Sequence, residues 1–159
     1  MFGFMRGKPE ATGTHPLGKS ALLSGLRASE LKIVEGFLHH RHYLPGEVVF
    51  DQGEEGQALY IVLSGRVVIC QQGQVDRPIA ELGAGAFFGE LALLDDSPRS
   101  AQARAGDPTE LAVLFRGDFE RLMEAHAQLA SRIAIQLARH LAQRLRNMVS
   151  LVPVEAKCQ

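Results

Sequence analysis

The sequence predicts a mainly β domain with helices at both ends. The middle of the chain consists of short apolar runs separated by glycine turns, a pattern typical of a barrel or a jelly roll. On either side, apolar residues instead recur every three or four positions, as they do on one face of a helix. The length of 159 residues suits one domain, and 46% hydrophobic residues are enough to fill its core.

The first part of the chain divides into a lead-in and a helical segment. Residues 1–19 are rich in Gly, Pro and Thr without periodicity, so we expect a mobile lead-in. Residues 20–37 are expected to be helical, with a second short helix beginning near Ser29. The apolar residues that can share one face of this segment are Leu22, Leu23, Leu26, Leu31, Val34 and Phe37.

Residues 38–115 are expected to form the β region. The apolar runs cover residues 48–50, 59–63, 67–70, 79–80 and 111–115. The turns between them are marked by Pro45-Gly46, Gly53, Gly56, Ser64-Gly65, Gly73, Gly83 and Gly85. Strands this short and evenly punctuated favour a closed or doubly layered antiparallel sheet.

Residues 117–150 are expected to return to helix, with Asp118 as the N-cap, and residues 151–159 to form a tail. Spacings of mostly four residues place an apolar stripe along one helical face. The stripe consists of Leu129, Ile133, Leu137, Leu141, Leu145 and Met148. It either packs back on the β region or pairs with a second copy of the chain. At about 1.5 Å per residue the helix reaches about 30 Å or more, longer than one small barrel covers, so the sequence favours a dimer.

Residues 89–99 contain the residue types that a sugar-phosphate site requires. Gly89 has no Cβ, so a ligand can approach the backbone closely there. A helical turn over residues 91–94 directs free N–H groups at an anion. Glu90 is suited to accept a hydrogen bond from a sugar hydroxyl. The planar fork of Arg99 suits bidentate contact with phosphate oxygens.

Residues 88–94, followed by residues 98–101, resemble the phosphate-binding cassette of cyclic nucleotide-binding domains. This family includes bacterial catabolite activator proteins, protein kinase A regulatory subunits and cyclic nucleotide-gated channels. The glycine-marked segments 43–47 and 59–67 are similar to hairpins of the same family. The resemblance implies an eight-stranded antiparallel jelly-roll barrel. It places the domain at residues 20–150, with N-terminal helices at 20–37, the barrel at 38–115, a cassette with a short helix at 87–101 and C-terminal helices at 117–150.

The same resemblance implies a role for individual residues. Glu90 would accept the ribose 2′-hydroxyl, and Arg99 would pair with the cyclic phosphate. The full set of ligand-binding candidates is Phe88, Gly89, Glu90, Leu91, Ala92, Arg99, Ser100 and Ala101. In catabolite activators the long helix contacts the base, and counting onward from Arg99 places Arg144 and Leu145 there. These are not the small hydroxyl residues expected, so Gln143 and Arg144 are either base contacts or solvated surface residues.

The resemblance favours cyclic AMP over cyclic GMP as the regulatory ligand. Ser100 and Ala101 look like the activator pattern, whereas many cyclic GMP sensors have Thr after the arginine. A cyclic dinucleotide remains open. No further cofactor is expected.

Composition narrows the possible partners and the location. A net charge of −1 provides no general attraction to nucleic acid or to an anionic membrane. The eleven residues after Met148 are too few for the DNA-binding winged helix of the activators, so we expect a sensor that signals to an unknown effector protein without direct DNA binding. Two distant cysteines and the absence of a long apolar run favour a cytoplasmic protein outside the membrane.

Two other function classes were weighed against this interpretation. A metal-dependent cupin enzyme would use His40, His42 and Glu47, but it needs a further His from a later strand, and the next is His126. No nucleophile–base pair is visible, so we expect no catalytic residues, no metal and no enzyme activity. The other alternative is a scaffold that has lost its ligand, and intact Glu90 and Arg99 argue against it.

Overall fold

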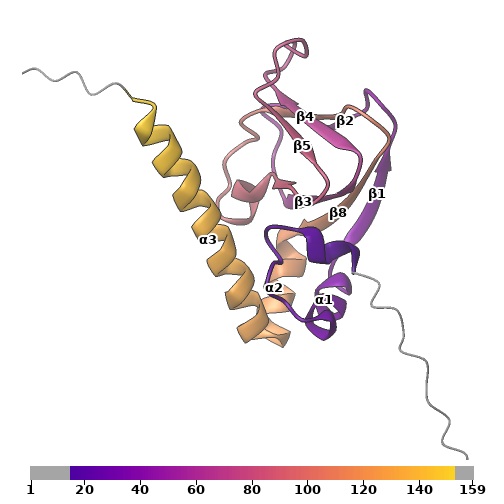
Figure 1. The fold of residues 1–159 in the computed structure, drawn as a ribbon, viewed down its shortest axis with the longest axis vertical. Coiled ribbons are helices and arrows are strands. Elements are labelled where there is room, and N and C mark those ends of the chain that lie inside the picture. Colours follow the sequence, from indigo (N-terminus) through magenta and orange to yellow (C-terminus); the bar gives the residue numbers. More distant parts are fainter. Residues whose placement is uncertain (1–14, 153–159) are drawn as a thin grey trace, which may run out of the picture.

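The structure is a computed structural model that describes residues 15–152, and its centre is a pair of four-stranded antiparallel sheets (Figure 1). One sheet has the order β1 (His39–Tyr43), β8 (Thr109–Phe115), β3 (Ala58–Ser64) and β6 (Phe87–Phe88). The other has the order β2 (Val48–Phe50), β7 (Gln102–Ala105), β4 (Arg66–Cys70) and β5 (Ala80–Gly83). The predicted number of strands, eight, and their antiparallel direction are confirmed. The strands of the described residues pair within two separate sheets, so a closed barrel is not what this structure shows.

Strands β3 and β8 of the first sheet are buried on both faces, which explains their nearly continuous apolar runs, whereas β1 at the edge is mostly exposed. Leu59 and Ile61 of β3 face a core shared with the helices. Val62 of β3 and Leu111 of β8 face a second core between the two sheets. Since side chains alternate along a strand, each of these strands supplies both cores at once. The cassette strand β6 follows the same rule, with Phe87 in the first core and Phe88 in the second.

The N-terminal region is less helical than predicted. A 3-10 helix η1 covers Pro16–Lys19 with Leu17 buried, so the lead-in ends before residue 19, and its first fourteen residues lie outside the described part. Residues 20–27 form turns rather than a helix, although Leu22 and Leu23 are buried as expected. Helix α1 covers Ala28–Glu35. Its N-cap is Arg27, whose backbone N–H donates to the Glu30 carboxylate at 2.8 Å, so the helix begins within one residue of Ser29, as expected.

The C-terminal region contains two helices, α2 (Arg116–Ala125) and α3 (Ala127–Ser150). The predicted capping role of Asp118 is wrong, because the helix begins one turn earlier, after Phe115. Asp118 instead lies in the first turn and binds other side chains. Its carboxylate pairs with Arg121 and with the ring of His39, the latter at 2.9 Å.

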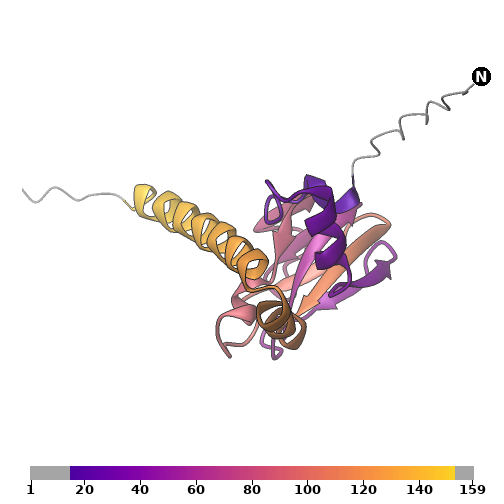
Figure 2. The same cartoon turned by 90° about the horizontal axis from the view of Figure 1, so that it is seen from below.

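The apolar stripe of α3 divides into two halves. Leu129, Ile133 and Leu137 are buried against the domain, whereas Leu145 is 62% exposed and Met148 is 66% exposed. Figure 1 and Figure 2 show the second half of α3 extending beyond the sheets. The first half of the stripe therefore packs back on the domain, and pairing of the exposed second half with another chain stays a prediction. Among residues 15–152, no helix is long and apolar enough to cross a membrane.

Candidate functional site

The cassette begins where β6 ends and the chain turns into a short 3-10 helix, η2 (Glu90–Leu93), which confirms the expected cassette helix. Gly89 precedes η2 with a φ of 73°, in the left-handed region that favours glycine. A Cβ on Gly89 would lie only 2.6 Å from Nη1 of Arg99. Conformation and space therefore both require glycine here.

Arg99 occupies the interior of the cassette and is only 8% exposed. Its Nη1 donates to the carbonyl of Gly89 at 2.9 Å, and its Nη2 donates to the carbonyl of Ala58 at 2.8 Å. The guanidinium lies 4.1 Å from the ring centroid of Phe50. Burial lowers the pKa of Arg99, and nearby Tyr60 partly opposes that shift. Nε is buried without a hydrogen-bond partner among the described residues, so one donor of this cation is left for a ligand.

The loop after β2 holds Arg99 from the other side. The backbone N–H of Arg99 donates to the carbonyl of Glu54 at 2.8 Å, and Gly53 N–H donates back to the carbonyl of Arg99 at 2.8 Å. A Cβ on Gly56 would lie 2.9 Å from Cβ of Ala92 and 3.0 Å from Nε of Arg99. Sequence reasoning treated Gly53 and Gly56 as turn markers only, and missed that their loop supports the site.

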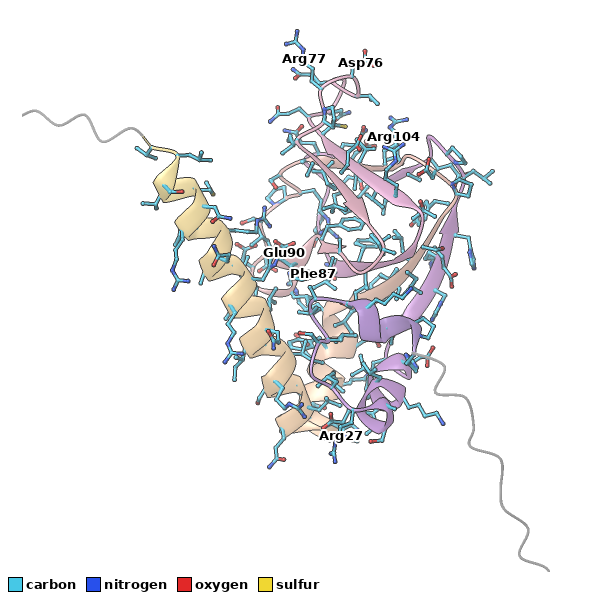
Figure 3. The ribbon with its side chains drawn as sticks, in the orientation of Figure 1. Arg27, Asp76, Arg77, Phe87, Glu90 and Arg104 are labelled. Carbon is cyan, nitrogen blue, oxygen red and sulfur yellow. The ribbon has the colours of Figure 1, made fainter. Side chains whose placement is uncertain are left out.

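Glu90 is buried, with 3% of its surface exposed, and its carboxylate accepts a hydrogen bond from Nη1 of Arg144 on α3. Figure 3 shows Glu90 and Phe87 in the space between the sheets and the middle of α3. The candidate base contact Arg144 is therefore at the site, paired with an acidic cassette residue. Gln143 instead donates to Asn147, one turn further along the exposed side of the helix, at 2.9 Å.

The remaining candidates lie in the same segment with different exposure. Phe88 is buried and stacks on Tyr60 with 5.2 Å between the ring centroids, and Ala92 is also buried. Leu91 is 47% exposed, Ser100 is exposed and Ala101 is half-buried. The structure thus brings Gly89, Glu90, Ala92 and Arg99 together, while the side chains of Leu91 and Ser100 face solvent.

Arg116, at the start of α2, joins the cassette to the C-terminal helices. Its guanidinium donates to the carbonyl of Ala92 at 2.9 Å and to the carbonyl of Asp95 at 2.6 Å. It also pairs with the Asp96 carboxylate at 2.5 Å. One side chain therefore links the cassette directly to the beginning of α2. Sequence reasoning missed this residue, because nothing local distinguishes it from a surface arginine.

Two histidines of β1 lie against carboxylates. His40 Nδ1 lies 3.0 Å from Glu110, and His39 pairs with Asp118. Over residues 15–152, no group of three or more His, Cys, Asp or Glu side chains is arranged to hold a metal ion. The proposed cupin set of His40, His42 and Glu47 gains no support from this geometry.

Comparison with known proteins shows which family has this site. A family model described as "Cyclic nucleotide-binding domain" matches residues 40–126. The cyclic AMP receptor protein of Thermus thermophilus is 40% identical over 126 residues, covering 78% of this chain and 58% of that protein. A cAMP-dependent protein kinase regulatory subunit of Emericella nidulans is 37% identical over 102 residues, covering 64% of this chain and 24% of that protein.

The fold agrees with these relatives. The crystal structure of the Thermus thermophilus catabolite activator protein matches with a TM-score of 0.70 and 38% identity, covering 83% of this chain and 63% of that chain. This chain belongs to the cyclic nucleotide-binding domain family. It spans a little more than half of one sequence relative and about a quarter of the other.

Proposed function

We propose that this chain is a cyclic nucleotide sensor that binds its ligand in the cassette and signals through its C-terminal helix. In this proposal Arg99 pairs with the cyclic phosphate and Glu90 accepts a sugar hydroxyl. No step is catalytic, and the sensor acts in the cytoplasm on an effector protein.

The proposal rests on the burial of Arg99 and on the contacts that its guanidinium makes. A guanidinium that is 8% exposed has only carbonyl and aromatic partners, and its buried Nε has none among the described residues. The Glu54 and Glu90 carboxylates act on this cation from beyond ion-pair distance. A phosphate in direct contact would supply a closer charge and an acceptor for Nε.

Cyclic AMP is the first choice of ligand and cyclic GMP the second. The names of the two sequence relatives refer to cyclic AMP, which supports this order. The segment from Gly89 to Ala101, with serine after the arginine, gives the same preference. The exposed half of the α3 stripe supports a further element of the proposal, pairing of two chains through α3.

Titration calorimetry with cyclic AMP, cyclic GMP and a cyclic dinucleotide tests the function. Arg99→Ala should weaken binding by about 2–5 kcal/mol, because a desolvated phosphate loses its charge partner. Arg99→Lys retains the charge without the planar fork, so its affinity should fall between those of the wild type and Arg99→Ala. Circular dichroism and thermal melting verify that each variant is folded.

Arg104→Ala is the matched control. Arg104 also has a buried Nε without a partner among the described residues, but it stands on β7 and donates to the carbonyl of Gly46 at 2.7 Å. Its removal should leave nucleotide affinity unchanged. Binding that survives in folded Arg99→Ala would refute the site, and no heat with any of the nucleotides would favour the scaffold.

A further inference from the structure

The turns at residues 20–27 and the first half of α3 enclose a surface groove with a volume of about 230 Å³. Leu22 and Ile133, which line it, are buried in the core, whereas Ile135 at its edge is 50% exposed. None of the described residues that line the groove is an aspartate or a glutamate. The groove therefore offers apolar surface to a side chain of another molecule.

Two arginines line the groove, and they differ in whether their charge is matched. Nη1 of Arg132 donates to the Glu30 carboxylate of α1 at 2.6 Å, and Nη2 donates to the carbonyl of Gly25 at 3.0 Å. Arg132 thus ties α1 and the turns to α3. Arg139 follows seven residues later on the same side of the helix. It is exposed and has no acidic partner within residues 15–152, so its charge is available to an anion.

The charges of the chain are unevenly distributed around this groove. Helix α3 contains four arginines and no aspartate or glutamate. Residues 15–126 contain ten Lys and Arg against sixteen Asp and Glu. The groove therefore attracts a local acidic group, whereas the acidic domain beside it repels an extended polyanion such as a nucleic acid or an anionic membrane.

We propose that this groove is the docking site for an acidic segment of the effector protein. An apolar side chain of that segment covers Ile135 in the groove, and a neighbouring carboxylate pairs with Arg139. The inference rests on the proposed function, because it names the chemistry of the partner on which the sensor acts. The docked segment lies on the same helix whose Arg144 contacts Glu90 of the cassette.

The first test measures binding of short labelled peptides to the full chain by fluorescence anisotropy, without nucleotide. The probe is a peptide of glutamates with one central leucine. Replacing the leucine with serine should weaken binding roughly 10-fold, because the apolar contact is lost. Replacing the glutamates with lysines should abolish binding. Equal binding of the leucine and serine peptides would overturn the groove as the site.

Variants of the chain locate the site, with circular dichroism to verify that each is folded. Arg139→Gln should weaken binding of the leucine peptide roughly 2- to 5-fold, the size of one exposed ion pair. Ile135→Glu should weaken it further, because it removes apolar surface and adds a like charge. Arg77→Gln is the matched control, since Arg77 is exposed on the β4–β5 loop, at the other end of the domain from the first half of α3 (Figure 3). Equal losses in Arg139→Gln and Arg77→Gln would refute a specific site.

Other occupants of the groove give different results. Arg139→Gln should sediment as the wild type does, and a shift toward monomer would assign the groove to a second copy of the chain instead. Tighter binding of a DNA duplex or of phosphatidylserine vesicles than of the leucine peptide would also overturn the proposal. If the wild type binds the peptide but no cyclic nucleotide, only the proposed function fails. If it binds the nucleotide but not the peptide, only this inference fails.

Discussion

At the scale of single residues, the surroundings of Arg99 distinguish this site from a plain surface turn. Phe50 and Tyr60 come from β2 and β3 and lie beside the guanidinium, with 4.1 Å and 5.6 Å to the ring centroids. A cation on aromatic faces is stabilised without being neutralised. Arg99 is thereby held inside the domain while its charge stays available for an anion.

The ionisation of the two tyrosines provides a pH-dependent test of this packing. Burial raises the pKa of Tyr43 and of Tyr60, the latter against the opposing effect of Arg99. Because the folded pKa lies above the unfolded value of about 10, the contribution of each tyrosine to stability is complete below that pH. It is lost as the pH rises through the folded pKa.

The chain contains two tyrosines and no tryptophan, so absorbance of tyrosinate reports these residues alone. We expect the native chain to ionise at higher pH than the same chain unfolded in urea. In the Tyr60→Phe variant, the difference in ionisation pH between the native and the unfolded chain should be smaller. Coincident titration curves for native and unfolded protein would show that the aromatic cluster around Arg99 is solvated.

The local part of the site was predictable from sequence and the distant part was not. Gly89, Glu90 and Arg99 lie within eleven consecutive residues, so their residue types and spacing were sufficient. Phe50 and Gly56 come from a strand and the loop after it, more than thirty residues earlier. They reach Arg99 only because the chain pairs Glu55 with Pro98, and no local pattern shows such a long-range pairing.

At the scale of elements, the strands were easier to predict than the helix boundaries. Four of the five apolar runs lie within β2, β3, β4 and β8, whereas the run at 79–80 meets β5 only at Ala80. Strands β1 and β7 contain no apolar run and were not located. Residues 20–27 have helical spacing but form turns, and Gly25 has a φ of 84° there. The break between α2 and α3 falls at His126, whose φ of −141° ends the first helix without any Gly or Pro to indicate it. Packing against the rest of the domain, rather than the local sequence, determines the turns at residues 20–27 and the helix break at His126.

The exposed second half of α3 is the basis for predicting a dimer. Leu145, Met148 and Val149 are each more than 60% exposed and are spaced three and four residues from Leu145 along the helix. An unpartnered stripe on a protruding helix is suited to the same stripe of a second chain. Polar substitution should therefore weaken self-association rather than the fold.

We expect the wild-type chain to sediment as a dimer and Leu145→Gln combined with Met148→Gln to sediment largely as a monomer. Each central residue lost from such an interface costs about 1 kcal/mol or more, and a symmetric dimer loses each one twice. Val75→Gln is the control, since Val75 is an exposed apolar residue between β4 and β5. A monomeric wild type at high concentration would rule out pairing through α3.

At the scale of the whole molecule, one path connects the ligand site to the surface that a partner would contact. The cassette binds α2 through Arg116, and Arg144 of α3 covers its Glu90. The two sheets provide a rigid support for both contacts, and α3 leaves the domain beyond them (Figure 2). A ligand that changed the cassette would act on the start of α2 through Arg116 and on the second half of α3 through Arg144, as the proposed switch between two helix positions requires.

The most direct test of this account is a crystal structure of the chain with cyclic AMP. We predict the cyclic phosphate within hydrogen-bond distance of Nε of Arg99 and a sugar hydroxyl on the carboxylate of Glu90. A nucleotide bound elsewhere, with Arg99 still donating only to the carbonyls of Gly89 and Ala58, would contradict the central claim.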